Sequence, residues 1–87
     1  MSESKFQSKL IKELEADGWY SIKLIKTNKN GIPDIVAIRG DRTLFLEVKS
    51  KTGKTSPLQD FRIKELTDKG IEAKVIREGE KLNEVIT

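Results

Sequence analysis

The chain has 87 residues, with 17 Lys or Arg against 14 Asp or Glu, so its formal net charge at pH 7 is +3. It contains no Cys and no His, which excludes disulfide scaffolds, thiolate metal sites, Cys nucleophiles, imidazole ligands and Ser-His-Asp triads. Any catalysis must therefore use carboxylates, lysines, hydroxyls or a metal ion bound through oxygen. The length predicts one domain over residues 1–87 with a small core, and homodimerisation would be a natural supplement to that core.

The sequence predicts a soluble, cytoplasmic protein with no membrane partner. Apolar runs are short, and the first residues, Met-Ser-Glu-Ser-Lys, lack the apolar stretch of a signal peptide. Hydrophobic residues make up 36% of the chain and fall in periodic segments, which predicts a globular rather than a disordered protein.

The first predicted element is a helix over residues 3–17. Phe6, Leu10 and Leu14 recur every four residues, which is the spacing of one buried helix face. Gly18 follows at the usual position of a helix stop.

Residues 19–26 alternate as a strand, with Tyr20, Ile22 and Leu24 on one face. At the junction of helix and strand, we expect Trp19 and Tyr20 to pack in the core or at an interface rather than to stack on a ligand.

Two further strands are predicted over residues 34–39 and 43–50. Turn-forming residues at 27–31 precede the first of them. The short connection Gly40-Asp41-Arg42 joins the two, so they should pair antiparallel.

A second helix is predicted to open at Ser56-Pro57-Leu58-Gln59, which combines a Ser cap, Pro at the first position and Gln at the third. We expect it to end at Gly70 and to bury a stripe of Leu58, Phe61 and Leu66.

A fourth strand is predicted over residues 72–77, followed by a short terminal helix over residues 80–87. The element order is therefore α-β-β-β-α-β. This order predicts the α/β class, with a mixed sheet flanked by helices.

The positive charge is concentrated in two stretches without acidic residues, at 18–33 and 48–59, which together carry +6 while the rest of the chain carries −3. One interpretation is that these lysines only form solvated surface. The alternative is that two basic segments converge on nucleic acid. Both stretches border the acidic residues considered next, which favours the second interpretation.

The acidic residues Asp34 and Glu47 lie on the neighbouring second and third strands, in a register that the sequence leaves open. Glu47 and Lys49 are two residues apart and share a strand face with Phe45. Burying these charges without partners would be costly. A divalent cation would supply a partner, because Mg²⁺ suits two carboxylates, one backbone carbonyl and waters. Such an ion can polarise a phosphate oxygen and lower the pKa of an attacking water.

Taken alone, Glu-x-Lys is usually a solvated strand face and Pro-Asp an ordinary turn. The combination is more specific: Gly31-Ile32-Pro33-Asp34 followed by Glu47-Val48-Lys49 resembles the PD-(D/E)xK nuclease superfamily, and in particular the VRR-NUC family of virus-type replication-repair nucleases. That family also has a Glu on its first helix and a Ser that opens a later helix with a Gln three residues on. Glu3, Ser56 and Gln59 match these positions.

The resemblance covers nearly the whole chain and implies a restriction-endonuclease-like fold. The short length is similar to stand-alone members of the kind found in phages, which would place the protein in the cytoplasm of a bacterial host.

The resemblance also implies roles for individual residues. Asp34, Glu47 and the Val48 carbonyl would bind the metal, and Lys49 would be the catalytic lysine. Glu3 would approach the metal directly or through water, or it would only be a first-turn acid favoured by the helix dipole.

Gln59 would reach the active site from its helix, or it would only form a capping box with Ser56, and both roles could coexist. Five lysines would track the DNA phosphates: Lys23, Lys26, Lys29, Lys51 and Lys54.

The function that the resemblance implies is a Mg²⁺- or Mn²⁺-dependent DNA endonuclease. We expect a structure-selective homodimer acting on branched DNA such as a Holliday junction, because a small subunit without a recognition helix has little surface for sequence readout. Three alternatives stay open: a nickase or flap nuclease, a catalytically silent DNA-binding module, and a plain dimeric structural domain.

Overall fold

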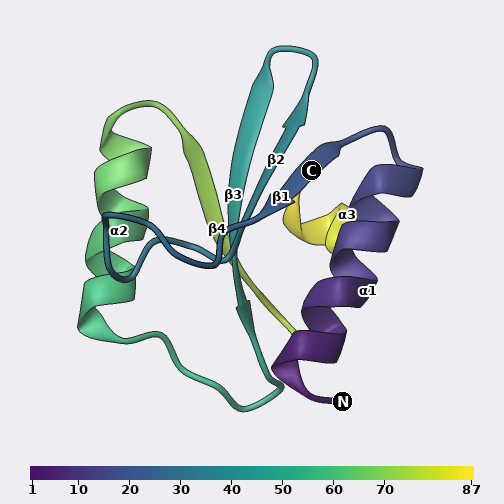
Figure 1. The fold of residues 1–87 in the computed structure, drawn as a ribbon, viewed down its shortest axis with the longest axis horizontal. Helices are drawn as coiled ribbons and strands as arrows, with labels where there is room; N and C mark the ends of the chain where they lie inside the picture. Colours follow the sequence, from purple (N-terminus) through teal and green to yellow (C-terminus); the bar gives the residue numbers. More distant parts are fainter.

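The fold is a four-stranded sheet with helices on both faces, seen nearly edge-on in Figure 1. The computed structural model describes all residues, Met1–Thr87. In chain order its elements are α1 (Glu3–Ala16), β1 (Tyr20–Lys23), β2 (Ile35–Arg39), β3 (Arg42–Lys49), α2 (Pro57–Asp68), β4 (Glu72–Arg77) and α3 (Leu82–Val85). This order confirms the predicted α-β-β-β-α-β arrangement, with the terminal helix reduced to about one turn. No helix is long and apolar enough to cross a membrane.

The strands lie in the order β1-β2-β3-β4, and only β3 and β4 pair parallel. Gly40 and Asp41 form the turn between β2 and β3, and Arg39 pairs with Arg42 across it. Gly40 has a φ of +61°, a conformation that glycine adopts without steric cost. Because parallel strands need a crossover connection, α2 runs over the sheet between β3 and β4.

The core lies between α1 and one face of the sheet. Ser2 caps α1, accepting a hydrogen bond from the Lys5 amide at 3.2 Å. The four-residue stripe of α1 packs against the alternate residues of β2 and β3 that point to the same side. The buried apolar residues are Phe6, Leu10, Leu14, Trp19, Ile35, Ala37, Leu44, Leu46, Val48, Ile76 and Ile86.

Trp19 is buried, as predicted, with 2% of its surface exposed. The guanidinium groups of Arg39 and Arg42 lie 4.5 and 5.2 Å from the centre of its ring. Arg42 also donates to both carboxylate oxygens of Glu72, at 2.9 and 2.7 Å, and to the Ile86 carbonyl at 2.9 Å. The β2–β3 hairpin is thereby tied to β4 and to the end of the chain.

The predicted buried stripe of α2 is partly wrong. Leu58 and Phe61 are 42% and 54% exposed, and the helix turns Ile63 and Leu66 inward instead. The reason is positional: α2 packs mainly on the edge strand β4, so only a narrow stripe of the helix meets the sheet.

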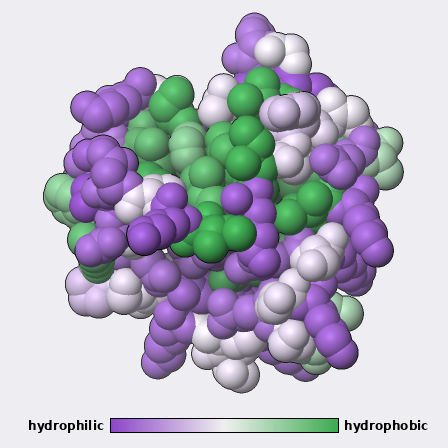
Figure 2. Space-filling view, viewed as in Figure 1, coloured by the Kyte–Doolittle hydropathy of each residue, from purple (hydrophilic) through white to green (hydrophobic).

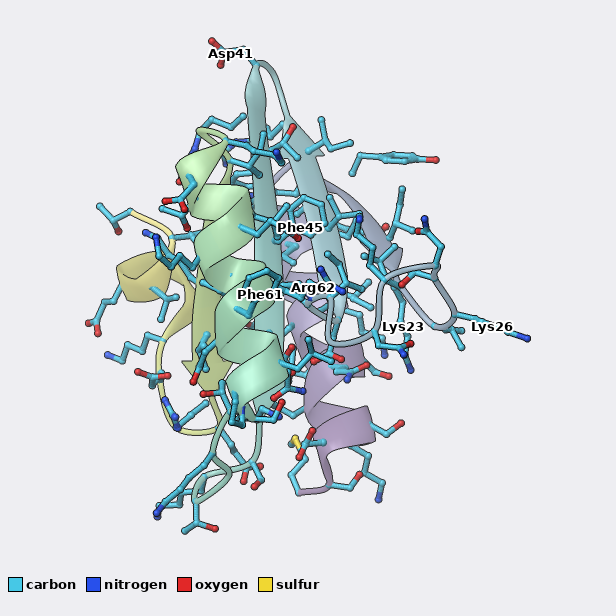
Figure 3. All side chains as sticks on the ribbon, turned by 90° about the vertical axis from the view of Figure 1, so that its left-hand side faces the viewer. Lys23, Lys26, Asp41, Phe45, Phe61 and Arg62 are labelled. Atoms are coloured by element: carbon cyan, nitrogen blue, oxygen red, sulfur yellow. The ribbon has the colours of Figure 1, made fainter.

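One part of the sheet, on the side away from α1, is left open because α2 does not reach over β1 and β2. Tyr20, Ile22 and Ile38 are 69%, 40% and 39% exposed there. The strand pairing places them beside the half-buried Val36 and Phe45. We call these five residues the uncovered sheet face. Figure 2 shows apolar atoms gathered on this side of the molecule, and Figure 3 shows Phe45 on the sheet beside α2.

Candidate active site

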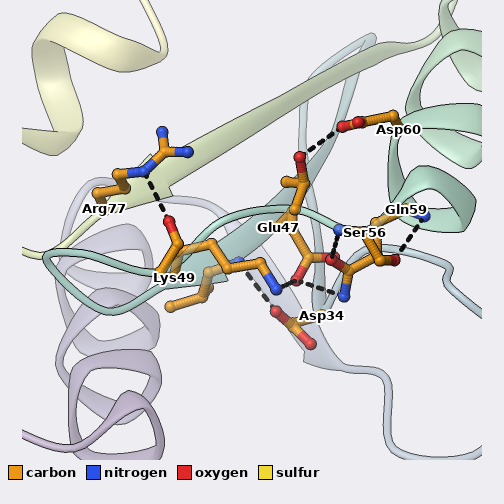
Figure 4. A network of polar contacts seen from close by, with 10 residues as sticks. Asp34, Glu47, Lys49, Ser56, Gln59, Asp60 and Arg77 are labelled. Carbon is orange, nitrogen blue, oxygen red and sulfur yellow. Dashed lines mark hydrogen bonds and ion pairs between the residues drawn. The ribbon is translucent and has the colours of Figure 1, made fainter.

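Asp34 and Glu47 come together at the end of the β2–β3 ladder. Ile35 pairs with Leu46, and continuing this antiparallel register by one residue sets Asp34 opposite Glu47. The Asp34 carboxylate accepts a hydrogen bond from the Val48 amide at 2.8 Å (Figure 4). The register that the sequence left open therefore brings the two acids onto the same face of neighbouring strands.

Glu47 is a buried acidic residue, with 2% of its side chain exposed. Its Oε2 lies 3.5 Å from the Lys49 ammonium and accepts a hydrogen bond from the side-chain amide of Gln59 at 3.4 Å. Its Oε1 is buried and has no hydrogen-bond partner. A buried carboxylate oxygen without a partner is uncommon, and it is the atom that a bound cation would satisfy.

Burial raises the pKa of Glu47 from 4.5 to about 8, with further upward contributions from the hydrogen bond and the negative charge of Asp34. Lys49 acts in the opposite direction but does not outweigh them. In the metal-free protein Glu47 is therefore largely protonated at neutral pH. Binding a cation would have to release that proton, so metal affinity should rise with pH up to about 8.

We expect Glu47→Gln to flatten the pH dependence of stability in the metal-free protein. The folded pKa is raised, so Glu47 favours folding below about 4.5, and this advantage is lost as pH rises to about 8. The loss is at most about 1.4 kcal/mol per pH unit, the limit for one proton. Thermal melts in EDTA between pH 5 and 9 test this.

The absence of His and Cys makes these melts easy to interpret, because few other groups titrate in that range. A wild-type melting temperature that rose from pH 6 to pH 8 would contradict the assignment.

Gln59 serves two purposes at once. The Ser56 hydroxyl accepts a hydrogen bond from the Gln59 backbone amide at 3.2 Å, and the Gln59 side-chain oxygen accepts one from the Ser56 backbone amide at 2.9 Å. These two bonds complete the predicted capping box. The other end of the same amide group donates to Glu47. The cap thus fixes the side chain that orients the buried carboxylate.

The loop that leads into Asp34 is held against α2 by contacts that the sequence did not reveal. Arg62 donates to the Asn30 carbonyl at 2.9 Å, and Gly31 lies directly against Leu58. No motif or spacing in the sequence indicated a role for Arg62, because its partner lies 32 residues away along the chain.

Gly31→Ala is expected to destabilise the protein more than Gly40→Ala. Both glycines have positive φ, +80° and +61°, so each alanine costs about 1 kcal/mol of backbone strain. At Gly31 the new Cβ would also lie 2.8 Å from Leu58 Cγ, whereas nothing lies within 4 Å at Gly40. The overpacking adds about 1–3 kcal/mol. Urea unfolding compares the two variants, and equal losses would contradict the packing described.

The remaining predicted residues lie outside this cluster. Glu3 is exposed in the first turn of α1, and no three acidic side chains gather closely enough to bind a metal together. Glu3 thus does not join Asp34 and Glu47. The five predicted DNA-binding lysines are all exposed and lie on β1 or on the loops flanking the site: Lys23, Lys26, Lys29, Lys51 and Lys54.

The VRR-NUC domain family matches residues 2–78 of the chain. The chain belongs to the VRR-NUC family. It is therefore a nuclease domain, and its sheet and helices have the restriction-endonuclease-like arrangement that the motifs implied.

Solved structures agree with this fold. A structure described as a VRR_NUC domain has a TM-score of 0.84 and 24% identity, over 97% of this chain and 92% of that one. A second, described as a VRR_NUC domain protein, has a TM-score of 0.76 and 21% identity, over 88% and 78%. The Holliday junction resolvase Hjc of Archaeoglobus fulgidus has a TM-score of 0.68 and 26% identity, over 85% of this chain and 66% of Hjc. No curated protein matches the chain significantly.

Nucleases of the PD-(D/E)xK type generally use divalent metals, and this VRR-NUC domain has suitable ligands. Asp34 and Glu47 supply two carboxylates on one face, and the unpartnered Oε1 of Glu47 is available for a cation. The donors are all oxygen, which suits Mg²⁺ or Mn²⁺.

Proposed function

We propose that this VRR-NUC domain is a divalent-metal-dependent endonuclease that hydrolyses phosphodiester bonds in branched DNA, including four-way junctions. The observation that carries the proposal is the buried Glu47, which has Asp34 opposite it, Lys49 beside it and one oxygen without a partner. A buried oxygen without a hydrogen-bond partner costs stability, which favours a role in binding a cation over a purely structural role for Glu47.

Asp34, Glu47 and the Val48 carbonyl would hold Mg²⁺ or Mn²⁺, with Glu3 outside this set unless a water links it. The bound ion would supply a Lewis acid that polarises the phosphate and favours an attacking hydroxide. Gln59 keeps the Glu47 carboxylate oriented through its 3.4 Å hydrogen bond. Asp34 is fixed by the Val48 amide, so both acids are held before substrate arrives.

Lys49 would place a positive charge beside the scissile phosphate. Its side chain is only 12% exposed, and its ammonium lies 3.5 Å from the Glu47 carboxylate. There it would stabilise the charge that builds up on the phosphate oxygens and orient the attacking water. The exposed lysines on both flanking loops would bind the phosphates on either side.

Branched DNA is the substrate class we favour for two reasons. The element order contains no helix-turn-helix pair, because three strands separate α1 from α2. In addition, one of the solved structures that resemble this chain is a Holliday junction resolvase.

Two alternatives make different predictions on labelled substrates. With Mg²⁺, symmetric paired cuts in a four-way junction, in preference to a flap and a linear duplex, are the expected result. Stronger cleavage of the flap or a single nick in duplex would assign the domain to the nickase or flap class. Binding without cleavage on every substrate would indicate a catalytically silent module.

We further propose that two copies associate through the uncovered sheet face. Its exposed apolar side chains span β1 and β2, and Phe61 lies exposed on the adjacent helix. Apolar side chains gathered on one face are a common feature of protein–protein interfaces, and the small core makes their burial valuable. Phe45 shares its strand face with Glu47, so a twofold dimer built here would place both active sites on the side of the interface.

Ile38→Lys is expected to raise the dimer dissociation constant at least about tenfold, because a desolvated charge would enter the apolar interface. Sedimentation over a concentration series measures this. Ile25→Ser is the matched control, since Ile25 is an exposed isoleucine outside the uncovered sheet face. The proposed interface would be contradicted by an Ile38→Lys variant that remains dimeric, or by a wild type that is monomeric at every concentration.

A further inference from the structure

Ile25 is the most exposed large apolar residue in the chain, with 85% of its surface open to solvent. It lies two residues beyond the end of β1, in the loop that leads to Asp34. A single exposed isoleucine is ordinary by itself. The surroundings of this one are unusual in three respects: the loop is held in place, it is basic, and it adjoins the active site.

The loop is held at several points. The Leu24 amide donates to the Asp34 carbonyl at 2.8 Å, directly before Ile25. The Thr27 hydroxyl accepts the Lys29 amide at 3.3 Å and donates to the Lys29 carbonyl at 2.9 Å. Arg62 donates a hydrogen bond to the Asn30 carbonyl. Ile25 is thus presented outward from a loop with a defined shape.

The same loop carries positive charge and no acid. Lys23, Lys26 and Lys29 are all exposed, and residues 18–33 contain no Asp or Glu. In Figure 3, Lys23 and Lys26 lie on the side of the molecule away from α2, where Lys26 projects into solvent. An apolar tip among lysines suits a ligand with anionic and apolar parts, as in a nucleic acid, where phosphates surround flat bases.

The loop also leads directly into one candidate metal ligand, Asp34. The loop and Asp34 line a hollow of about 240 Å³, whose walls include Ile25 and Lys29. DNA whose phosphate reaches Asp34 would therefore pass along this loop. A lipid surface would need the same face free of DNA, so continuity with the site favours DNA.

We propose that Ile25 contacts an unstacked base at the branch point of the DNA, while Lys26 and Lys29 hold the neighbouring phosphates. This inference rests on the proposed function and adds the element that recognises DNA shape. In continuous duplex the bases are stacked and an isoleucine at the surface gains little. At a branch the base faces are exposed, so the same side chain buries apolar surface and favours the distorted DNA.

The experiment is a binding titration with a four-way junction that carries 2-aminopurine at the branch, beside a linear duplex of the same length. Ca²⁺ replaces Mg²⁺ so that binding is measured without relying on cleavage. Wild type should raise the 2-aminopurine fluorescence. Ile25→Ser should lose that rise and bind the junction about tenfold more weakly, with duplex affinity unchanged. Ile25→Leu should restore both.

Lys26→Ala is the matched control. Loss of a phosphate contact should weaken binding to the junction and to the duplex alike, and it should reduce the slope of log Kd against log salt concentration by about one. The inference is overturned if Ile25→Ser binds the junction as wild type does, or if it loses junction and duplex equally. It is also overturned if Ile25 is needed for binding to anionic vesicles and not to the junction. A wild-type protein that binds the junction but never cleaves it would contradict the proposed function and leave the inference about Ile25 intact.

Discussion

Lys49→Ala should slow Mg²⁺-dependent DNA cleavage by at least about a hundredfold while leaving junction affinity within about twofold. The ammonium lies 3.5 Å from Glu47 on a side chain that is only 12% exposed, so its charge is held beside the proposed metal ligands. We expect affinity for DNA to rest mainly on the exposed lysines of the loops, which the substitution does not touch. Single-turnover cleavage and binding in Ca²⁺ separate the two quantities.

A second effect of Lys49→Ala has to be distinguished from the loss of a catalytic group. Removing the ammonium takes away the one influence that lowers the pKa of Glu47, so metal binding at neutral pH should weaken as well. Cleavage should therefore also be measured at pH 9 and saturating Mn²⁺, conditions that favour the ionised, metal-bound form of Glu47. The defect should persist there, and full recovery would mean that Lys49 acts only through Glu47. Lys51→Ala, on the exposed loop that follows, should change the rate only a few-fold.

Asp34→Asn should lower Mn²⁺ affinity by about a hundredfold or more and abolish measurable cleavage. Only two carboxylates meet at the site, so the substitution removes half of the negative charge that holds the cation. The asparagine oxygen can still accept the Val48 amide, so the fold should be retained. Isothermal titration with Mn²⁺, together with a thermal melt, measures both effects.

Asp41→Asn is the matched control for Asp34→Asn. Asp41 is an exposed aspartate at the tip of the β2–β3 hairpin (Figure 3), at the opposite end of the β2–β3 ladder from Asp34. It should leave Mn²⁺ affinity and cleavage unchanged. If Asp34→Asn bound Mn²⁺ as tightly as Asp41→Asn, Asp34 would not be a metal ligand.

Much of the site was predictable because it depends on short-range rules. Glu47 and Lys49 share a face since side chains alternate along a strand, and the short turn at Gly40-Asp41 fixes how β3 returns along β2. Those two rules were enough to expect Asp34 near Glu47. The register, and with it the hydrogen bond to the Val48 amide, required the structure.

Other features depended on contacts that a local pattern does not contain. Leu58 and Phe61 have the spacing of a buried stripe, yet they are exposed because α2 lies over the edge of the sheet. The strand predicted over residues 19–26 pairs only from Tyr20 to Lys23, and the loop that presents Ile25 begins after it. The anchoring of that loop by Arg62 joins residues 32 apart.

The most direct test of the central claim is cleavage of a synthetic four-way junction by the wild-type protein, with Lys49→Ala beside it. In Mg²⁺ the wild type should make paired cuts near the crossover, EDTA should stop them, and Lys49→Ala should bind the junction without cutting it. If wild type and Lys49→Ala were equally active or equally inert in both Mg²⁺ and Mn²⁺, the assignment of this cluster as a metal-dependent nuclease site would be wrong.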